Sequence, residues 1–220
     1  MTVKIQVRKI ALILLIALIG ALANSLLSRF IQKVLGLSLY LDTVFTIATT
    51  FSGGLISGIL CGFVTNLFNL ISAGYNWWEY LFALCNAASA LIVWVFMGFY
   101  PAELGGLRFY SPRRESRRPM GVIIILLILS FTLCVLISIM GGAISALVES
   151  TNPEVTFSSP SAETWFKLSL LREGIPLLAV EIIARLPVNI VDRIISVFAA
   201  YGIASLIKRF KNTYFLYNHE

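Results

Sequence analysis

Four polar residues near the C-terminal end of the sequence have the types and spacing of a small-molecule site. Asn189 is followed by Asp192 and Arg193 at spacings of three and four, and Arg185 precedes Asn189 by four residues. On a helix such spacings bring side chains onto adjoining positions of one face. Two interpretations stay open: a structural pair between Asp192 and Arg193, or a pocket in which these groups orient a ligand.

A second group combines aromatic and polar side chains. Trp78 follows another tryptophan and precedes Glu79, and Asn86 lies about two helical turns later. The two indole rings could form a stacking platform for a flat heteroaromatic ligand, with Glu79 and Asn86 as its polar contacts. The alternative is the belt of aromatic residues that membrane proteins carry at the interface between lipid and water.

Asp42 and Thr46 lie four residues apart and share a helical face with two further threonines. An ionisable residue in an apolar span usually faces the bundle interior or a watery cavity, so Asp42 is a candidate for the pocket. A position near a helix start also permits a structural role for Asp42. Thr46 could serve the pocket or simply bond to its own helix backbone.

Several classes of chemistry are excluded by what the sequence lacks. Its one histidine, His219, is the second-last residue, and its three cysteines lie far apart in apolar runs. This leaves no histidine-based catalytic triad and no metal-binding pair. The sequence also has no Gly-x-x-x-x-Gly-Lys-Ser/Thr run, the pattern of a phosphate-binding loop. We therefore expect a passive binding protein that is not an enzyme, uses no cofactor or metal and binds no nucleic acid.

The elements that position these residues are expected to be membrane-spanning helices. Apolar residues make up 58% of the 220-residue chain, charged residues make up 13%, and the mean hydropathy is +0.88. Soluble domains carry about a quarter charged residues. We predict an all-α integral membrane protein with one transmembrane domain, 1–220, surrounded by lipid. Its six spans are expected at about residues 10–28, 38–51, 55–72, 81–99, 121–147 and 187–208.

Two of these spans come from one apolar stretch, 37–72. As a single helix this stretch would measure about 54 Å, against a hydrocarbon core of about 30 Å. The Gly53-Gly54 pair is its only break and is expected to form a turn between two helices. The last span is expected to begin directly after Pro187. The first apolar run has the features of a signal peptide, but its length past a small-residue triplet favours a retained span.

Basic residues predict the orientation in the membrane. Eleven of the 17 Lys and Arg residues lie in the N-terminal tail, in the loop between the fourth and fifth spans, and at the C-terminal end. With six spans all three regions, and therefore both termini, lie in the cytoplasm, as the positive-inside rule requires. Residues 149–183 then form an external lid segment between helices five and six. Residues 164–183 could lie on the surface, re-enter the membrane or, less favourably, span it as a seventh helix.

Three sequence runs give the chain a resemblance to a known family. They are Leu41-Asp42-Thr43, the run GILCGFVTNL from Gly58 to Leu67, and the run LPVNIVDRIISV from Leu186 to Val197. With about six spans in some 200 residues, the chain resembles the substrate-binding (S) components of energy-coupling factor (ECF) transporters. It is similar in particular to riboflavin-type S components and to related sensor modules.

The resemblance implies a function, a location and partners. It implies a subunit of the bacterial cytoplasmic membrane that captures a vitamin-like small molecule, such as riboflavin, on the external side for uptake. It also implies docking on a transmembrane coupling protein served by two ATPase subunits. Ala17 and Ala21 match the Ala-x-x-x-Ala pattern through which the family docks. The alternatives are a ligand-sensing or scaffolding membrane module that signals to a separate partner and, less favoured, an intramembrane enzyme.

Overall fold

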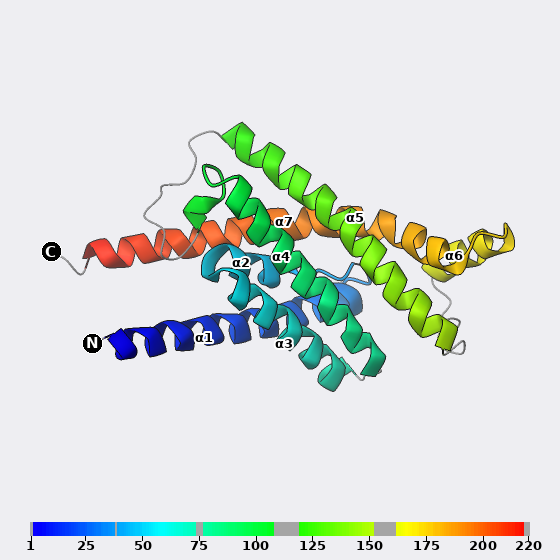
Figure 1. The fold of residues 1–220 in the computed structure, drawn as a ribbon, viewed down its shortest axis with the longest axis horizontal. Coiled ribbons are helices and arrows are strands. Elements are labelled where there is room, and N and C mark those ends of the chain that lie inside the picture. The colour runs from blue at the N-terminus through cyan, green and yellow to red at the C-terminus, as the bar shows by residue number, and fades with distance from the viewer. Residues whose placement is uncertain (1, 38, 74–76, 108–118, 152–161, 218–220) are drawn as a thin grey trace.

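The computed structural model describes residues 2–37, 39–73, 77–107, 119–151 and 162–217, and within these ranges the chain is helical, with no strand (Figure 1). The elements, in chain order, are α1 (Thr2–Arg29), the π-helix η1 (Phe30–Val34), α2 (Val44–Gly53), α3 (Leu55–Ala73), the 3₁₀ helix η2 (Trp77–Phe82), α4 (Ala83–Phe99), the 3₁₀ helix η3 (Gly105–Leu107), α5 (Pro119–Thr151), α6 (Ala162–Arg172) and α7 (Leu177–Tyr217).

The described chain is all-helical, and its apolar helices are consistent with a multi-pass membrane protein. Within the described residues, five helical stretches are long and apolar enough to cross a membrane: Ile13–Val34, Leu55–Ser72, Trp77–Phe99, Pro119–Thr151 and Leu177–Phe210. They correspond to five of the six expected spans. The remaining apolar helix, α2, has ten residues, which is about 15 Å or half of a hydrocarbon core.

The fold-back at the Gly53-Gly54 pair is confirmed. The α2 helix ends at Gly53, α3 begins at Leu55 and packs against α2, and Gly54 has a φ of 90°, which glycine adopts without steric cost. The expected helix at 38–51 is wrong at its start. Residues 35–43, of which 38 lies outside the described residues, do not continue into α2, and α2 begins only at Val44.

The expected start of the last span after Pro187 is also wrong. The α7 helix begins ten residues earlier, at Leu177, and carries Pro187 in its interior. Proline is tolerated inside transmembrane helices where neighbouring helices satisfy the freed backbone, and α5 packs along α7. Glu181 and Arg185, two charged residues in the N-terminal part of α7, are paired with each other across 3.8 Å. The lid segment 149–183 is therefore not separate: its first residues belong to α5 and its last to α7.

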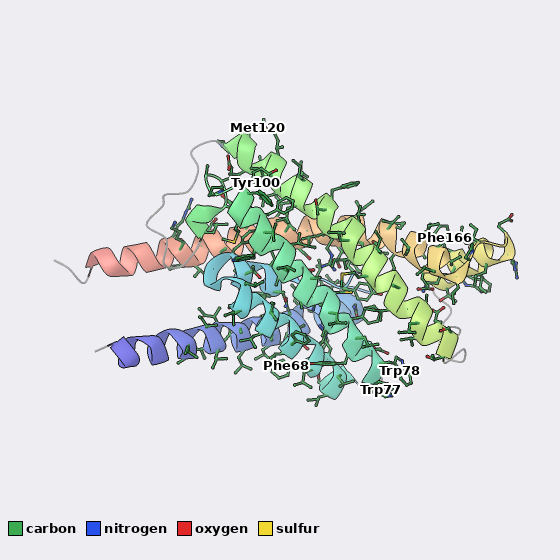
Figure 2. All side chains as sticks on the ribbon, viewed as in Figure 1. Phe68, Trp77, Trp78, Tyr100, Met120 and Phe166 are labelled. Atoms are coloured by element: carbon green, nitrogen blue, oxygen red, sulfur yellow. The ribbon has the colours of Figure 1, made fainter. Side chains whose placement is uncertain are left out.

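The bundle has an apolar end and a polar end. Leu129, Phe51 and Val93 belong to a buried cluster that extends to η3 and to the first turns of α5. Figure 2 shows Tyr100 and Met120 toward this end, and Trp78 and Phe166 toward the other. The start of α1 and the end of α7 lie on the same side of Figure 1 as the apolar end. The arginine loop between α4 and α5 lies outside the described residues.

Candidate functional site

A cavity of about 340 Å³ opens in the polar end of the bundle. It is lined by residues of α1, the segment before α2, α3, η2, α4, α5 and α7. Seven of the nine binding residues that the sequence predicts meet in its wall: Asp42, Trp78, Glu79, Asn86, Arg185, Asn189 and Arg193. Because 42 and 193 are far apart in sequence, only the folded bundle brings them into one wall.

Several wall residues are ones that we did not predict. Tyr40, Asn69, Phe82, Ser145 and Glu149 also line the cavity. The signal for Asn69 is an asparagine inside an apolar span, three residues after a second asparagine that also lines the cavity. No sequence signal points to Ser145 or Phe82, since serine and phenylalanine are ordinary in membrane helices. These two residues line the cavity only because of the way α5 and η2 pack in the folded bundle.

Asp192 is the first of two predicted binding residues that the structure places elsewhere. Its side chain is fully buried and lies outside the cavity wall. One carboxylate oxygen, Oδ2, accepts the backbone N–H groups of Tyr40 and Leu41 at 2.8 and 2.9 Å. The other, Oδ1, accepts the hydroxyl of Ser196 at 3.2 Å. Asp192 therefore satisfies backbone donors that the non-helical segment cannot satisfy itself.

Arg193 completes this anchor while also reaching the cavity. Its Nη2 lies 3.2 Å from Asp192 Oδ1, and its Nη1 donates to the hydroxyl of Thr43. Leu41, between these contacts, has a φ of 44°, a left-handed conformation that a leucine adopts only when its surroundings impose it. The structural pair of Asp192 and Arg193 that the sequence left open is thus formed, and it holds the segment that carries Asp42.

Thr46 is the second predicted residue that lies outside the cavity. It is fully buried and accepts a hydrogen bond from Asn24 Nδ2 at 3.0 Å. The same amide donates to Thr65, and Asn24 Oδ1 accepts the backbone N–H of Phe45 at 2.8 Å. An amide on α1 thus satisfies a donor in the first turn of α2, so this cluster joins three helices and leaves Thr46 no role in the cavity.

A charged cluster, here called the outer cluster, lies beside the cavity, and two of its residues, Glu149 and Arg185, line the wall. Lys167 of α6 lies 2.8 Å from Glu181 Oε1 and 3.8 Å from Glu149 Oε1. Arg185 donates to the hydroxyl of Ser145, and its guanidinium lies 5.2 Å from the centre of the Phe82 ring. Glu181 is fully buried, so its pairing with Lys167 is what makes its burial tolerable. Through these contacts α6 is fastened to α5 and α7 beside the cavity.

The aromatic part of the wall is formed by η2. Trp78 lines the cavity and packs edge-on against Trp77, with ring centres 5.6 Å apart, whereas Trp77 is 73% exposed. The indole Nε1 of Trp78 is buried without a hydrogen-bond partner, and so are single atoms of three other wall residues: Glu149 Oε2, Arg185 Nε and Arg193 Nε. Buried polar atoms left unpaired cost about 1–3 kcal/mol each, which indicates a wall that a polar ligand or water completes.

The remaining polar groups of the wall are positioned by neighbouring helices. Asn189 donates to Ser138 Oγ of α5 at 2.8 Å, and Asn86 donates to Asp42 Oδ2 at 3.4 Å. The α3 and α4 helices approach closely here, because a Cβ at Gly62 would lie 2.9 Å from the Cβ of Asn86. The glycine therefore sets the depth at which Asn86 faces the cavity.

Ala17 and Ala21 do not lie on the exposed side of α1. They are 2% and 0% exposed and form a buried cluster with Cys61 of α3. The expectation that their side chains contact a partner protein is therefore corrected: small residues here allow α1 and α3 to pack within one chain. Within the described ranges, no group of three or more His, Cys, Asp or Glu residues could hold a metal ion.

Comparison with known proteins adds no further assignment. A scan against protein-family models found no matching family, and searches of curated proteins and of solved structures found no match. The function is therefore argued from the cavity and its surroundings.

Proposed function

We propose that the chain is the substrate-binding component of an ECF-type uptake transporter in a bacterial cytoplasmic membrane. The observation that carries this proposal is that seven residues chosen from the sequence alone line one cavity. Its volume of about 340 Å³ fits a small vitamin-like molecule. The wall combines one stacking aromatic ring with a few polar groups, as small-molecule sites do.

We infer six crossings with both termini in the cytoplasm. The second crossing would consist of α2 together with the segment before it, in which the described residues 35–37 and 39–43 are not helical, because α2 alone is too short. Non-helical backbone is tolerated at membrane depth only where protein buries it or where it lines a cavity. Asp192 satisfies this backbone, and Tyr40 and Asp42 line the cavity. Interrupted helices of this kind form the binding sites of many transporters.

In this orientation the cavity faces outward and α6 lies beside its outer end. The basic ends of the chain then lie inside, which agrees with the positive-inside rule. Substrate would enter from outside, and the ion pair between Lys167 and Glu181 would hold α6 near the mouth while the ligand is bound. Energy for release to the cytoplasm would come from two ATPases through a coupling protein, since this sequence has no phosphate-binding loop.

The second candidate function is a ligand-sensing or scaffolding module. The same cavity supports it, because sensing and capture both need a ligand site connected to a partner. Tagged chain purified in mild detergent from its native membrane separates the two. Recovery with a transmembrane coupling protein and two ATPases supports transport, whereas recovery with a kinase or another signalling protein and no ATPase contradicts it.

Binding in the cavity is tested with a matched pair of tryptophans. Trp78→Ala should weaken binding of an aromatic ligand at least tenfold, about 1.4 kcal/mol, because the indole forms the stacking wall. Trp77→Ala is the control, since Trp77 is 73% exposed and does not line the cavity. Ligand should also slow maleimide labelling of Cys85, which lines the cavity. Equal effects of the two substitutions would place the ligand elsewhere.

A further inference from the structure

The charges around Asp42 do not balance. Its electrostatic neighbours are Arg193 and Asp192, so one guanidinium serves two carboxylates. That guanidinium is already 3.2 Å from Asp192 Oδ1 and donates to Thr43. Asp192 in turn accepts two backbone N–H groups and a hydroxyl. Asp192 is therefore fully satisfied, and the excess negative charge of the trio resides on Asp42.

Asp42 itself has weak compensation. The hydrogen bond that reaches its side chain from another residue is the Asn86 amide at 3.4 Å, near the upper limit for such a bond. Unlike Asp192, Asp42 lies in the cavity wall, so its carboxylate is presented to whatever occupies the cavity. A carboxylate inside an apolar bundle is costly unless a positive charge or several hydrogen-bond donors face it.

The basic residues of the outer cluster are already matched by carboxylates. In the outer cluster, Glu149 and Glu181 are matched by Lys167 and Arg185, which leaves the cluster neutral. Around Asp42 and in the outer cluster, four acidic side chains therefore face three basic ones. An anionic ligand would enter a site that already carries an excess of negative charge.

We propose that the cavity selects a ligand with a positively charged group, a protonated amine or a cationic nitrogen heterocycle, which pairs with Asp42. This deepens the proposed function, on which it rests, by naming the substrate class. The apolar part of the ligand would contact Trp78, Phe82 and Ile137. Riboflavin, whose ring system is uncharged at neutral pH, fits this charge pattern less well than an amine-bearing ring of similar or smaller size.

The test uses three probes that share an indole ring and differ in charge. Tryptamine is cationic at neutral pH, tryptophol is neutral and indole-3-acetate is anionic. Their binding to the full chain in detergent is measured by isothermal titration calorimetry in potassium and in sodium buffer. Tryptamine should bind at least tenfold more tightly than tryptophol, about 1.4 kcal/mol, with indole-3-acetate weakest. This comparison needs no variant and decides the charge preference on the unmodified chain.

Variants then identify the residue that pairs with the positive charge of the ligand. Asp42→Asn should reduce the preference for tryptamine over tryptophol to less than threefold, whereas Asp42→Glu, which keeps the charge, should retain most of it. Glu173→Gln, a charge removal at an exposed residue between α6 and α7, should leave it unchanged. A preference that survives Asp42→Asn but is lost in Glu79→Gln would overturn the assignment to Asp42.

Three results would overturn the inference as a whole. They are equal or tighter binding of tryptophol or indole-3-acetate, absence of binding by all three probes, and loss of tryptamine binding in sodium but not in potassium buffer, which would indicate an inorganic sodium site. Recovery of the chain with a coupling protein and ATPases tests the proposed function separately. The substrate class and the transport function can therefore fail independently.

Discussion

Replacing Asp192 with alanine separates an anchoring role from a ligand contact. The sequence alone allowed Asp192 to bind ligand directly, whereas the structure places its carboxylate outside the cavity and against the backbone of Tyr40 and Leu41. If Asp192 is an anchor, its loss should mainly lower the stability of the fold. If it is a ligand contact, its loss should weaken binding while stability stays the same.

The expected magnitude follows from the contacts that are lost. Hydrogen bonds to a charged group contribute about 1.5–3 kcal/mol each, and Asp192 accepts two from backbone N–H groups. Its removal also leaves Arg193, which is 3% exposed, without its carboxylate partner. Breaking a buried pair in this way costs about 3–5 kcal/mol, so we expect a loss of that order. For a chain of this size this corresponds to a lowering of Tm on the order of 10 °C.

The assay is thermal unfolding of the purified chain in detergent, with tryptophan fluorescence as the signal. Ser196→Ala is the matched control: it removes one hydrogen bond to the same carboxylate, from a hydroxyl at the long distance of 3.2 Å, and should cost about 1.5 kcal/mol, the lower end for a bond to a charged group. A Tm for Asp192→Ala within about 2 °C of the wild type would refute the anchoring argument. Weakened tryptamine binding with unchanged Tm would restore Asp192 as a ligand contact.

Two further predictions concern α6 and the packing of α7 against α5. Lys167→Met should speed ligand release several-fold in a stopped-flow displacement experiment, because α6 loses its 2.8 Å ion pair with Glu181; an unchanged release rate would show that α6 does not retain the ligand. Gly142→Ala should cost about 1–3 kcal/mol in thermal unfolding, because a Cβ there would lie 2.6 Å from Ile182 Cγ1 and 2.9 Å from its backbone nitrogen. Gly202→Ala, where a Cβ meets no atom within 4 Å, should be neutral or slightly stabilising, so equal losses at the two glycines would contradict the close contact between α5 and α7.

Local sequence features were enough for the class of fold and for seven of the residues in the wall of the cavity. A continuous run of apolar residues must become a helix in lipid, because only a helix satisfies its own backbone there. The break at Gly53-Gly54 was readable because two adjacent glycines interrupt such a run. Polar residues such as Asn86 and Asn189 could be predicted to line a cavity because lipid penalises them at any outward-facing position.

Helix boundaries depended on contacts between distant residues. Residues 35–37 and 39–43 do not form a helix, and the carboxylate of Asp192, about 150 residues away, accepts two of the backbone N–H groups of this segment. The start of α7 at Leu177 likewise depends on Glu181, which is buried because Lys167 of α6 meets it. The sequence around Glu181 shows its charge but does not show that Lys167 compensates it.

The division between wall and support was likewise decided only in three dimensions. Asp192 and Arg193 are adjacent in sequence and equally polar, yet one is wholly engaged with a neighbouring segment while the other also reaches the cavity. Ala17 and Ala21 have the spacing of a docking surface and are instead buried against α3. Composition and spacing determine that such residues must avoid lipid or permit close packing. Which neighbour they meet is set by the rotation of each helix about its axis, and that rotation is fixed by the packing of the whole bundle.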